Sequence, residues 1–274
     1  MKHSSFFIIL IFIISACTSN PFFGDDAARD KHIVKGKVLL EYGDSTEDIY
    51  IWLENLNIST RTNAQGDFKL ELPRTDDLSG YNNDLKLYYY VGNYAIQHSN
   101  LLVVDGIFEF GKYDINNDGF IKETVYLKKL IDITTTIRPE AMPRDYNGSV
   151  DVEVKIINLD TNLLVINRMT REGVLSGYIF REINSPSTSA KIIDFSSVFY
   201  RGYRLYNPVT WTGSFVWEKN FLLSGTYEVY PYIFLRQEDI PQELLESFGT
   251  KADQLTDAYL KIPFKHNSDI LTIN

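Results

Sequence analysis

The sequence is poor in the residues that cross-link a chain or bind metal ions. Cys17 is its only cysteine, and it has four histidines in 274 residues. A single cysteine excludes an intramolecular disulfide and a cysteine-rich zinc site. His32, His98 and His266 lie far apart with no partner at metal-motif spacing, so we expect each to be a surface or turn residue. We therefore predict that the packing of side chains alone stabilises the fold. We expect no bound cofactor, except that one loop is a candidate for calcium.

Catalytic patterns and clustered basic residues are also missing. The chain has no G-x-S-x-G, H-E-x-x-H or P-loop pattern, so we predict no enzyme. A hydrolase would need converging acids or a Ser-His pair that the sequence does not reveal. Lys and Arg number 27 against 36 Asp and Glu, and these charges are scattered. A nucleic-acid partner, which needs a clustered basic face, is therefore not expected.

Only one apolar run stands out, at the very start of the chain. It covers Phe6–Ile14 after the positive Lys2 and has the length of a signal-peptide core, too short for a spanning helix of roughly 20 residues. Ile14-Ser15-Ala16-Cys17 follows, and this tetrapeptide resembles the bacterial lipobox. An ordinary signal peptide with a chance cysteine, or an uncleaved anchor, is the alternative.

The lipobox resemblance implies a signal peptide at 1–16, a fatty-acylated Cys17 that carries palmitate-type chains, and a tether over residues 17–31. By resemblance to lipoproteins of Gram-negative bacteria, Thr18 after the cysteine favours the outer membrane. The protein would then be lipid-anchored there, in the periplasm or exposed on the surface. The expected membrane contact is through the N-terminal lipid.

The aromatic content points to an all-β protein, because 18 Tyr and 17 Phe against 3 Met suit half-buried strands better than helical bundles. We predict two tandem β-sandwich domains, of the Ig-like or transthyretin-like kind, over 32–130 and 131–274. A stretch around Thr134–Thr136 and 138–147 is a linker or a first edge strand. The predicted strands are His32–Leu40, Asp48–Leu53, Ser59–Thr62, Asp67–Leu72, Leu85–Val91, Val150–Ile156, Leu163–Ile166, Val174–Arg181, Ala190–Phe195, Trp211–Trp217 and Tyr227–Leu235.

The first predicted domain resembles the carboxypeptidase regulatory-like domain, a transthyretin-type sandwich. The resemblance rests on Gly36–Val38, Ile49–Leu53 and Thr60–Pro73. Its most specific part is Thr62-Asn63-x-x-Gly66-x-Phe68, where an Asx residue starts a hairpin, glycine takes a positive-φ corner and an aromatic ring returns to the core. The family more often has Asp in place of Asn63. Such domains carry no peptidase residues, so the resemblance implies a structural or binding module.

The segment from Asp114 to Ile121 matches the first eight positions of a calcium loop. Oxygens at positions 1, 3, 5 and 7 would converge on the ion, but position 12 is Val125 rather than a bidentate acid. A plain Asx-rich hairpin turn fits the same residues. The candidate calcium ligands are Asp114, Asn116, Asp118, the carbonyl of Phe120, and Glu123.

Two further patterns mark the second predicted domain. Leu222-x-x-Gly225-x-Tyr227 resembles the tyrosine corner of Ig-like sandwiches, in which the hydroxyl bonds back to the backbone. One short helix is predicted between Asp239, which would cap its start, and Gly249. A helix in this position most often closes the open end of the sandwich, and we expect that role here. Ala258–Phe264 is expected to be the closing strand.

Trp211 and Trp217 stand six residues apart, so they would lie on the same face of one continuous strand. Core packing is the default for such residues, and a sugar-stacking platform is the alternative. We therefore predict a non-enzymatic, membrane-anchored lipoprotein that serves as a structural, adhesion or partner-binding module of the cell envelope. The alternative function is a carbohydrate-binding accessory lipoprotein. The possible partner is accordingly a protein or a polysaccharide.

Overall fold

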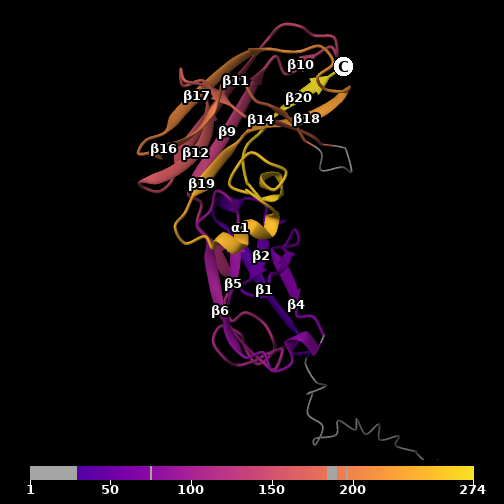
Figure 1. The fold of residues 1–274 in the computed structure, drawn as a ribbon, viewed down its shortest axis with the longest axis vertical. Helices are drawn as coiled ribbons and strands as arrows, with labels where there is room; N and C mark the ends of the chain where they lie inside the picture. Colours follow the sequence, from indigo (N-terminus) through magenta and orange to yellow (C-terminus); the bar gives the residue numbers. More distant parts are fainter. Residues whose placement is uncertain (1–29, 75, 184–189, 196) are drawn as a thin grey trace, which may run out of the picture. The chain divides into compact units, whose positions relative to one another are not determined.

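The protein is all-β with one short α-helix in the computed structural model, which describes residues 30–74, 76–183, 190–195 and 197–274. Residues 31–274 form one compact unit. Within this unit, one set of strands comes from residues 31–130, the first β region, and another from residues 131–274, the second β region (Figure 1). No helix among the described residues is long and apolar enough to cross a membrane.

Two sheets face each other in the first β region and enclose a core. One has the order β4-β1-β8 and the other β3-β2-β5-β6-β7. Alternate residues of β1 and β5, such as Val34, Val38, Leu85 and Leu87, point into the shared core. The elements are β1 (Ile33–Leu40), η1 (Glu41–Gly43), β2 (Tyr50–Leu53), β3 (Ile58–Arg61), β4 (Asp67–Glu71), η2 (Asp76–Leu78), β5 (Asn83–Tyr90), β6 (Gln97–Val104), β7 (Ile107–Phe108) and β8 (Val125–Leu127).

The second β region contains three sheets around a separate core. Their orders are β17-β11-β9, β10-β20-β18-β14-β15 and β13-β12-β16, and β19 also pairs with β12. The strands are β9 (Ile131–Arg138), β10 (Ala141–Met142), β11 (Ser149–Asn158), β12 (Leu163–Met169), β13 (Leu175–Ser176), β14 (Tyr178–Glu182), β15 (Ala190–Ile193), β16 (Phe199–Leu205), β17 (Val209–Val216), β18 (Gly225–Pro231), β19 (Ile233–Arg236) and β20 (Asp269–Ile273).

The predicted tyrosine corner is confirmed. The hydroxyl of Tyr227, at the start of β18, donates a hydrogen bond of 3.0 Å to the carbonyl oxygen of Leu223. The Tyr227 ring is buried in the core of the second β region. The bond therefore ties the loop before β18 to the strand that follows it.

The C-terminal part of the chain differs from the prediction in two places. Residues 258–264 are not a strand: they contain the 3-10 helix η3 (Tyr259–Lys261), and β20 closes the fold instead. Pro263 has no amide hydrogen for a sheet ladder, and the side chains of Tyr259 and Ile262 turn into a core cluster. The helix α1 (Gln242–Phe248) starts after Pro241, whose backbone is extended, and has no side-chain cap from Asp239.

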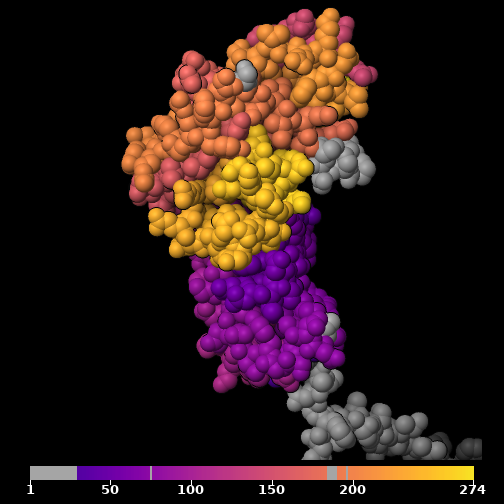
Figure 2. All heavy atoms as spheres, viewed as in Figure 1, coloured from indigo at the N-terminus to yellow at the C-terminus, as the bar shows by residue number. Residues whose placement is uncertain are grey.

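Helix α1 was predicted to plug the open end of a sandwich, and this prediction is wrong. It packs on the outer face of β2 and β5, where the rings of Tyr50 and Phe248 lie 4.3 Å apart and the Tyr50 hydroxyl contacts Ser247 Oγ at 2.8 Å (Figure 1). The result is a third apolar cluster shared by residues of both β regions. Figure 2 shows the C-terminal residues, in gold, packed against the indigo and purple residues of the first β region.

Candidate functional site

Cys17 lies outside the described residues, as do the predicted signal peptide at 1–16 and the tether up to residue 29. The lipidation site therefore remains a prediction. The other predicted sites fall on described residues, and the structure places each of them.

The segment proposed for calcium is folded as a tight turn that uses its own oxygens. Asn116 Oδ1 accepts hydrogen bonds from the amides of Asp118 and Phe120, both at 2.9 Å. The Phe120 carbonyl accepts one from the Asn116 amide at 2.8 Å, and Asp114 Oδ2 accepts one from the Asn100 amide at 2.6 Å. Glu123 is exposed. Among the described residues, no group of three or more His, Cys, Asp or Glu is placed to hold a metal ion.

Trp211 and Trp217 share one face of the β17 segment, but both side chains are buried in the core, at 8% and 2% exposure. Trp211 contacts the Tyr203 ring edge to face at 5.4 Å, and Trp217 packs on Phe180 and Phe221. Rings packed in this way present no flat face to a sugar. The structure therefore assigns these two residues to packing.

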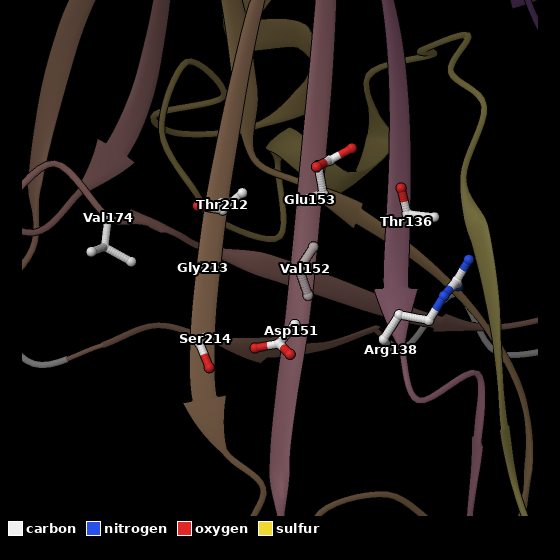
Figure 3. A pocket seen from close by; sticks show the side chains of 9 residues that line it. All are labelled: Thr136, Arg138, Asp151, Val152, Glu153, Val174, Thr212, Gly213 and Ser214. Carbon is white, nitrogen blue, oxygen red and sulfur yellow. The ribbon is translucent and has the colours of Figure 1, made fainter.

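An open hollow of about 670 Å³ lies on the sheet formed by β17, β11 and β9. Figure 3 shows the side chains that line it. Its rim consists of outward side chains, with Asp151 and Glu153 on the central strand opposite the small Ser214 and Thr212. The one cation, Arg138, is neutralised by Glu140 at 2.5 Å and Asp269 at 3.1 Å. This hollow is a solvated polar sheet face rather than a formed site.

A larger cleft of about 1100 Å³ opens where the segment after η3 meets both β regions. Asp48 and Arg61 reach it from the first β region, and Arg181 and Tyr230 from β14 and β18. We call it the basic cleft. Its lining residues are Asp48, Arg61, Arg181, Ala190, Tyr230, Asp257, Tyr259, Leu260, Lys261, Ile262, Pro263, Phe264, Lys265 and His266.

Cations outnumber carboxylates in the basic cleft. Arg61, Arg181, Lys261 and Lys265 line it against only two acids, although the whole chain carries a formal charge of −9. Arg61 is paired with Asp48 at 2.7 Å. Arg181 Nη1 lies 4.0 Å from Glu228 Oε2. Lys265 Nζ donates to the carbonyl of Glu47 at 2.8 Å, and the charges of Asp48, Asp44 and Glu47 act on its ammonium. Lys261 forms no ion pair with any described residue, so among the lining side chains the positive charges exceed the negative ones.

Burial shifts the pKa values of two side chains in the cleft. Desolvation lowers the pKa of Lys265, because the charged ammonium loses hydration. The Tyr230 hydroxyl is buried and has no hydrogen-bond partner among the described residues. Burial raises the pKa of Tyr230 to about 12, with the nearby Arg181 opposing the rise. The phenol therefore stays protonated at neutral pH and remains a hydrogen-bond donor.

His266 differs from the prediction that it would be a surface or turn residue. Its side chain is 8% exposed and its ring lies 4.4 Å from the Tyr230 ring. His266 Nε2 is 3.4 Å from Glu228 Oε1, the same oxygen that accepts a 2.7 Å hydrogen bond from Ser268 Oγ. The contact with His266 comes first among the causes that lower the pKa of Glu228 to about 2.

Sequence reasoning missed the basic cleft because its residues come from six separate places in the chain between Asp48 and His266. The only local signal was the run Lys261-Ile-Pro-Phe-Lys-His266, in which three basic residues flank a proline. That run resembled a strand by composition, so its charges were assigned to a solvated surface.

No protein-family model and no curated protein matches this chain. Among solved structures, the chain is similar to the Bacillus anthracis TIE protein, at 9% sequence identity and a TM-score of 0.22. The similarity covers 75% of this chain and 31% of that chain, so the present chain spans less than a third of its length. We draw no functional argument from a similarity at this level.

Proposed function

We propose that this protein is a non-enzymatic lipoprotein, anchored to the outer membrane through Cys17, that binds an anionic group of an envelope partner in the basic cleft. The observation that carries the proposal is the concentration of four cationic side chains in one cleft of an acid-rich chain. A carboxylate or phosphate entering the cleft would gain charge-assisted hydrogen bonds, which are roughly twice as strong as neutral ones.

The cleft offers donors for such a group without a large reorganisation. Lys261 is exposed and has no ion pair to break among the described residues. The partly buried Phe264 ring supplies apolar surface beside the charges.

The geometry of Ser268, Glu228 and His266 supports a binding role rather than hydrolysis. In a catalytic triad the base must accept the serine proton, and the acid orients the base from its far side. Here the serine donates to the carboxylate directly, and the histidine contacts the same carboxylate oxygen. The cluster therefore fixes residues 266–268 to β18 and gives the hydroxyl only a carboxylate of lowered pKa, which is a weak base.

The family resemblances belong to the same proposal. We assign the first β region to the carboxypeptidase regulatory-like type and the second to the Ig-like type. Supporting the first, Asn63 Oδ1 accepts bonds from the amides of Gln65 and Asp67 at 3.0 and 2.9 Å, and Gly66 has φ of 78°. Supporting the second is the Tyr227 corner.

The anion site is tested by binding polyglutamate and polygalacturonate to the full-length protein and to Arg181→Gln/Lys265→Gln. We expect the double variant to lose at least tenfold in affinity for both probes. Arg144→Gln/Lys155→Gln, two exposed residues outside the cleft, makes the same change in charge and is the matched control. Equal affinity of the two double variants would refute the site.

Anchoring is tested separately by fatty-acid labelling and membrane fractionation of Cys17→Ala. We expect the label to disappear and the protein to leave the membrane fraction. A Cys17→Ala protein that stays on the membrane would end the lipoprotein proposal, while leaving the basic cleft untouched.

Carbohydrate binding is the second candidate, and exposed aromatic rings favour it. Trp211 and Trp217 are buried, but Phe199, Tyr200, Tyr203 and Tyr206 of the β16 segment are 39–66% exposed. Exposed rings can stack on sugars through their apolar faces. Retention of the full-length protein on neutral polysaccharide columns, lost in Tyr203→Ala/Tyr206→Ala, is the expected result for this candidate.

A further inference from the structure

Strand β16 is an edge strand exposed along nearly its whole length. Six of its seven residues are exposed, and only Leu205 is buried. It pairs with β12 over seven consecutive positions, from Met169 opposite Phe199 to Leu163 opposite Leu205. No other described strand pairs with it, and Figure 1 shows it at the margin of the second β region.

The free side of β16 is a template for another strand. An edge strand presents a row of unpaired N–H and C=O groups, and proteins commonly protect such an edge by shortening it, by charged side chains, by proline or by a bulge. Strand β16 is seven residues long, has no proline and keeps one continuous register with β12, so the charges of Arg201 and Arg204 are what it has of these devices.

The charges along this edge indicate what it can accept. Arg201 and Arg204 lie on β16, and Arg171 stacks on Phe199, with its guanidinium carbon 5.8 Å from the ring centroid. Two of them donate hydrogen bonds to uncharged oxygens, Arg201 to the Arg171 carbonyl and Arg204 to Asn162 Oδ1. None of the three forms an ion pair with a described residue. Strand β16 itself contains no acid.

These charges disfavour a second copy of the chain as the occupant. An antiparallel pair of two β16 strands in the register that sets Arg201 opposite Arg204 would place like charges directly across the strand pair, which is destabilising, and in every register the two copies would add four arginines and no acid to the paired edge. An acidic segment instead gains cross-strand pairs with Arg201 or with Arg204, which point to opposite faces of the strand, according to the face that its acids occupy.

The aromatic rings do not form one platform for a flat ligand. Successive residues of a strand point to opposite faces. Accordingly, Tyr203 packs on Trp211, whereas Tyr200 packs on Tyr232 and lies under the Arg168 guanidinium. What is continuous along β16 is therefore the backbone edge, with rings and arginines on both sides of it.

We propose that β16 is a docking edge for an extended acidic segment of a partner protein, which adds to the β13-β12-β16 sheet as a further strand. Main-chain hydrogen bonds would supply affinity and the arginines would select acidic sequences, as in other cases of strand addition. This site is separate from the basic cleft and does not depend on the function proposed for it.

The test uses an eight-residue peptide with alternating Glu and Val, at low salt, with the full-length protein. We expect saturable binding, and hydrogen exchange of the amides in 199–205 slowed at least tenfold by the peptide. The double variant Arg201→Glu/Arg204→Glu should bind at least tenfold more weakly. Arg144→Glu/Lys155→Glu, with the same charge change elsewhere on the surface, should bind as the unmodified protein does.

The controls separate strand addition from other contacts. A peptide of the same charge with proline in place of each Val lacks alternate amide donors and should neither bind nor protect β16. Equal binding of both peptides, or binding without protection of 199–205, would overturn the proposal in favour of simple charge attraction. Absence of binding would overturn it as well. Protection of β16 that rises with protein concentration alone would assign the edge to a second copy, and protection by neutral polysaccharide would assign it to carbohydrate.

Discussion

Asn93 and Lys265, 172 positions apart in the chain, are joined by two reciprocal hydrogen bonds. The Lys265 amide donates to Asn93 Oδ1 at 3.1 Å, and Asn93 Nδ2 donates to the Lys265 carbonyl at 2.6 Å. Nδ2 also donates to the Ile131 carbonyl at 3.1 Å. One fully buried amide thus ties the turn after β5 to the start of β9 and to the segment that lines the basic cleft.

Replacing this amide should be costly. Asn93→Ala leaves the backbone groups of Lys265 and Ile131 buried without partners, so we expect a loss of about 2–4 kcal/mol in the free energy of unfolding. Urea denaturation measures it. Asn147→Ala, at an exposed position, should stay within about 0.5 kcal/mol of the unmodified protein. An equally small loss for Asn93→Ala would show that the bonds add no stability.

The tyrosine corner makes a second prediction. Tyr227→Phe removes only the hydroxyl that bonds to Leu223, so we expect a loss of about 1 kcal/mol in unfolding free energy. Tyr126→Phe changes a residue that is 64% exposed and should be neutral. If thermal and urea unfolding show the two variants to be equally stable, the corner bond does not contribute.

Gly66 tests the hairpin turn on which the family resemblance depends. A Cβ at Gly66 would lie 2.2 Å from the Val38 carbonyl oxygen, and its φ of 78° already disfavours a side chain. Gly43 has a similar φ of 72° but open space around it. We therefore expect Gly66→Ala to lose at least about 1 kcal/mol more than Gly43→Ala in urea denaturation. Equal losses would mean that backbone strain alone operates at both positions.

Stability should depend on pH through Glu228. Its pKa in the folded protein is about 2, below the ordinary 4.5. This shift corresponds to about 3 kcal/mol, which solvent screening of the partly exposed carboxylate reduces to about 2 kcal/mol of stabilisation above pH 4.5. The contribution disappears as pH falls from 4.5 towards 2. Glu228→Gln should thus be less stable than the unmodified protein at pH 7, with the difference shrinking below pH 4.5.

The matched control for this titration is Glu218→Gln, at an exposed position. Unfolding curves at several pH values should show no pH-dependent difference between that variant and the unmodified protein. A Glu228→Gln difference that stays constant from pH 7 to pH 3 would contradict the role of the carboxylate beside His266, Ser268 and Arg181.

Strand positions were predictable where one face is buried and the other solvated. The alternation Val150, Val152, Val154, Ile156 predicted β11, and the structure buries all four residues. Residues 258–264 were misassigned because apolar residues that turn into a core from a 3-10 helix resemble a short strand in sequence. The outward Tyr88 and Tyr90 of β5 are buried only because a distant helix covers them.

Local chemistry in the sequence was enough to establish the all-β class, the Asn63 turn and the Tyr227 corner. In each case the signal lies within about eight residues: alternation, an Asx side chain before a glycine, or a tyrosine two residues after one. Only the tertiary structure decided the packing of α1 on β2 and β5, the basic cleft and the free edge of β16. The first two features depend on segments that meet across more than a hundred residues, and the edge of β16 depends on pairing with β12, 30 to 42 positions away. Packing between distant segments leaves no periodic mark on any one of them.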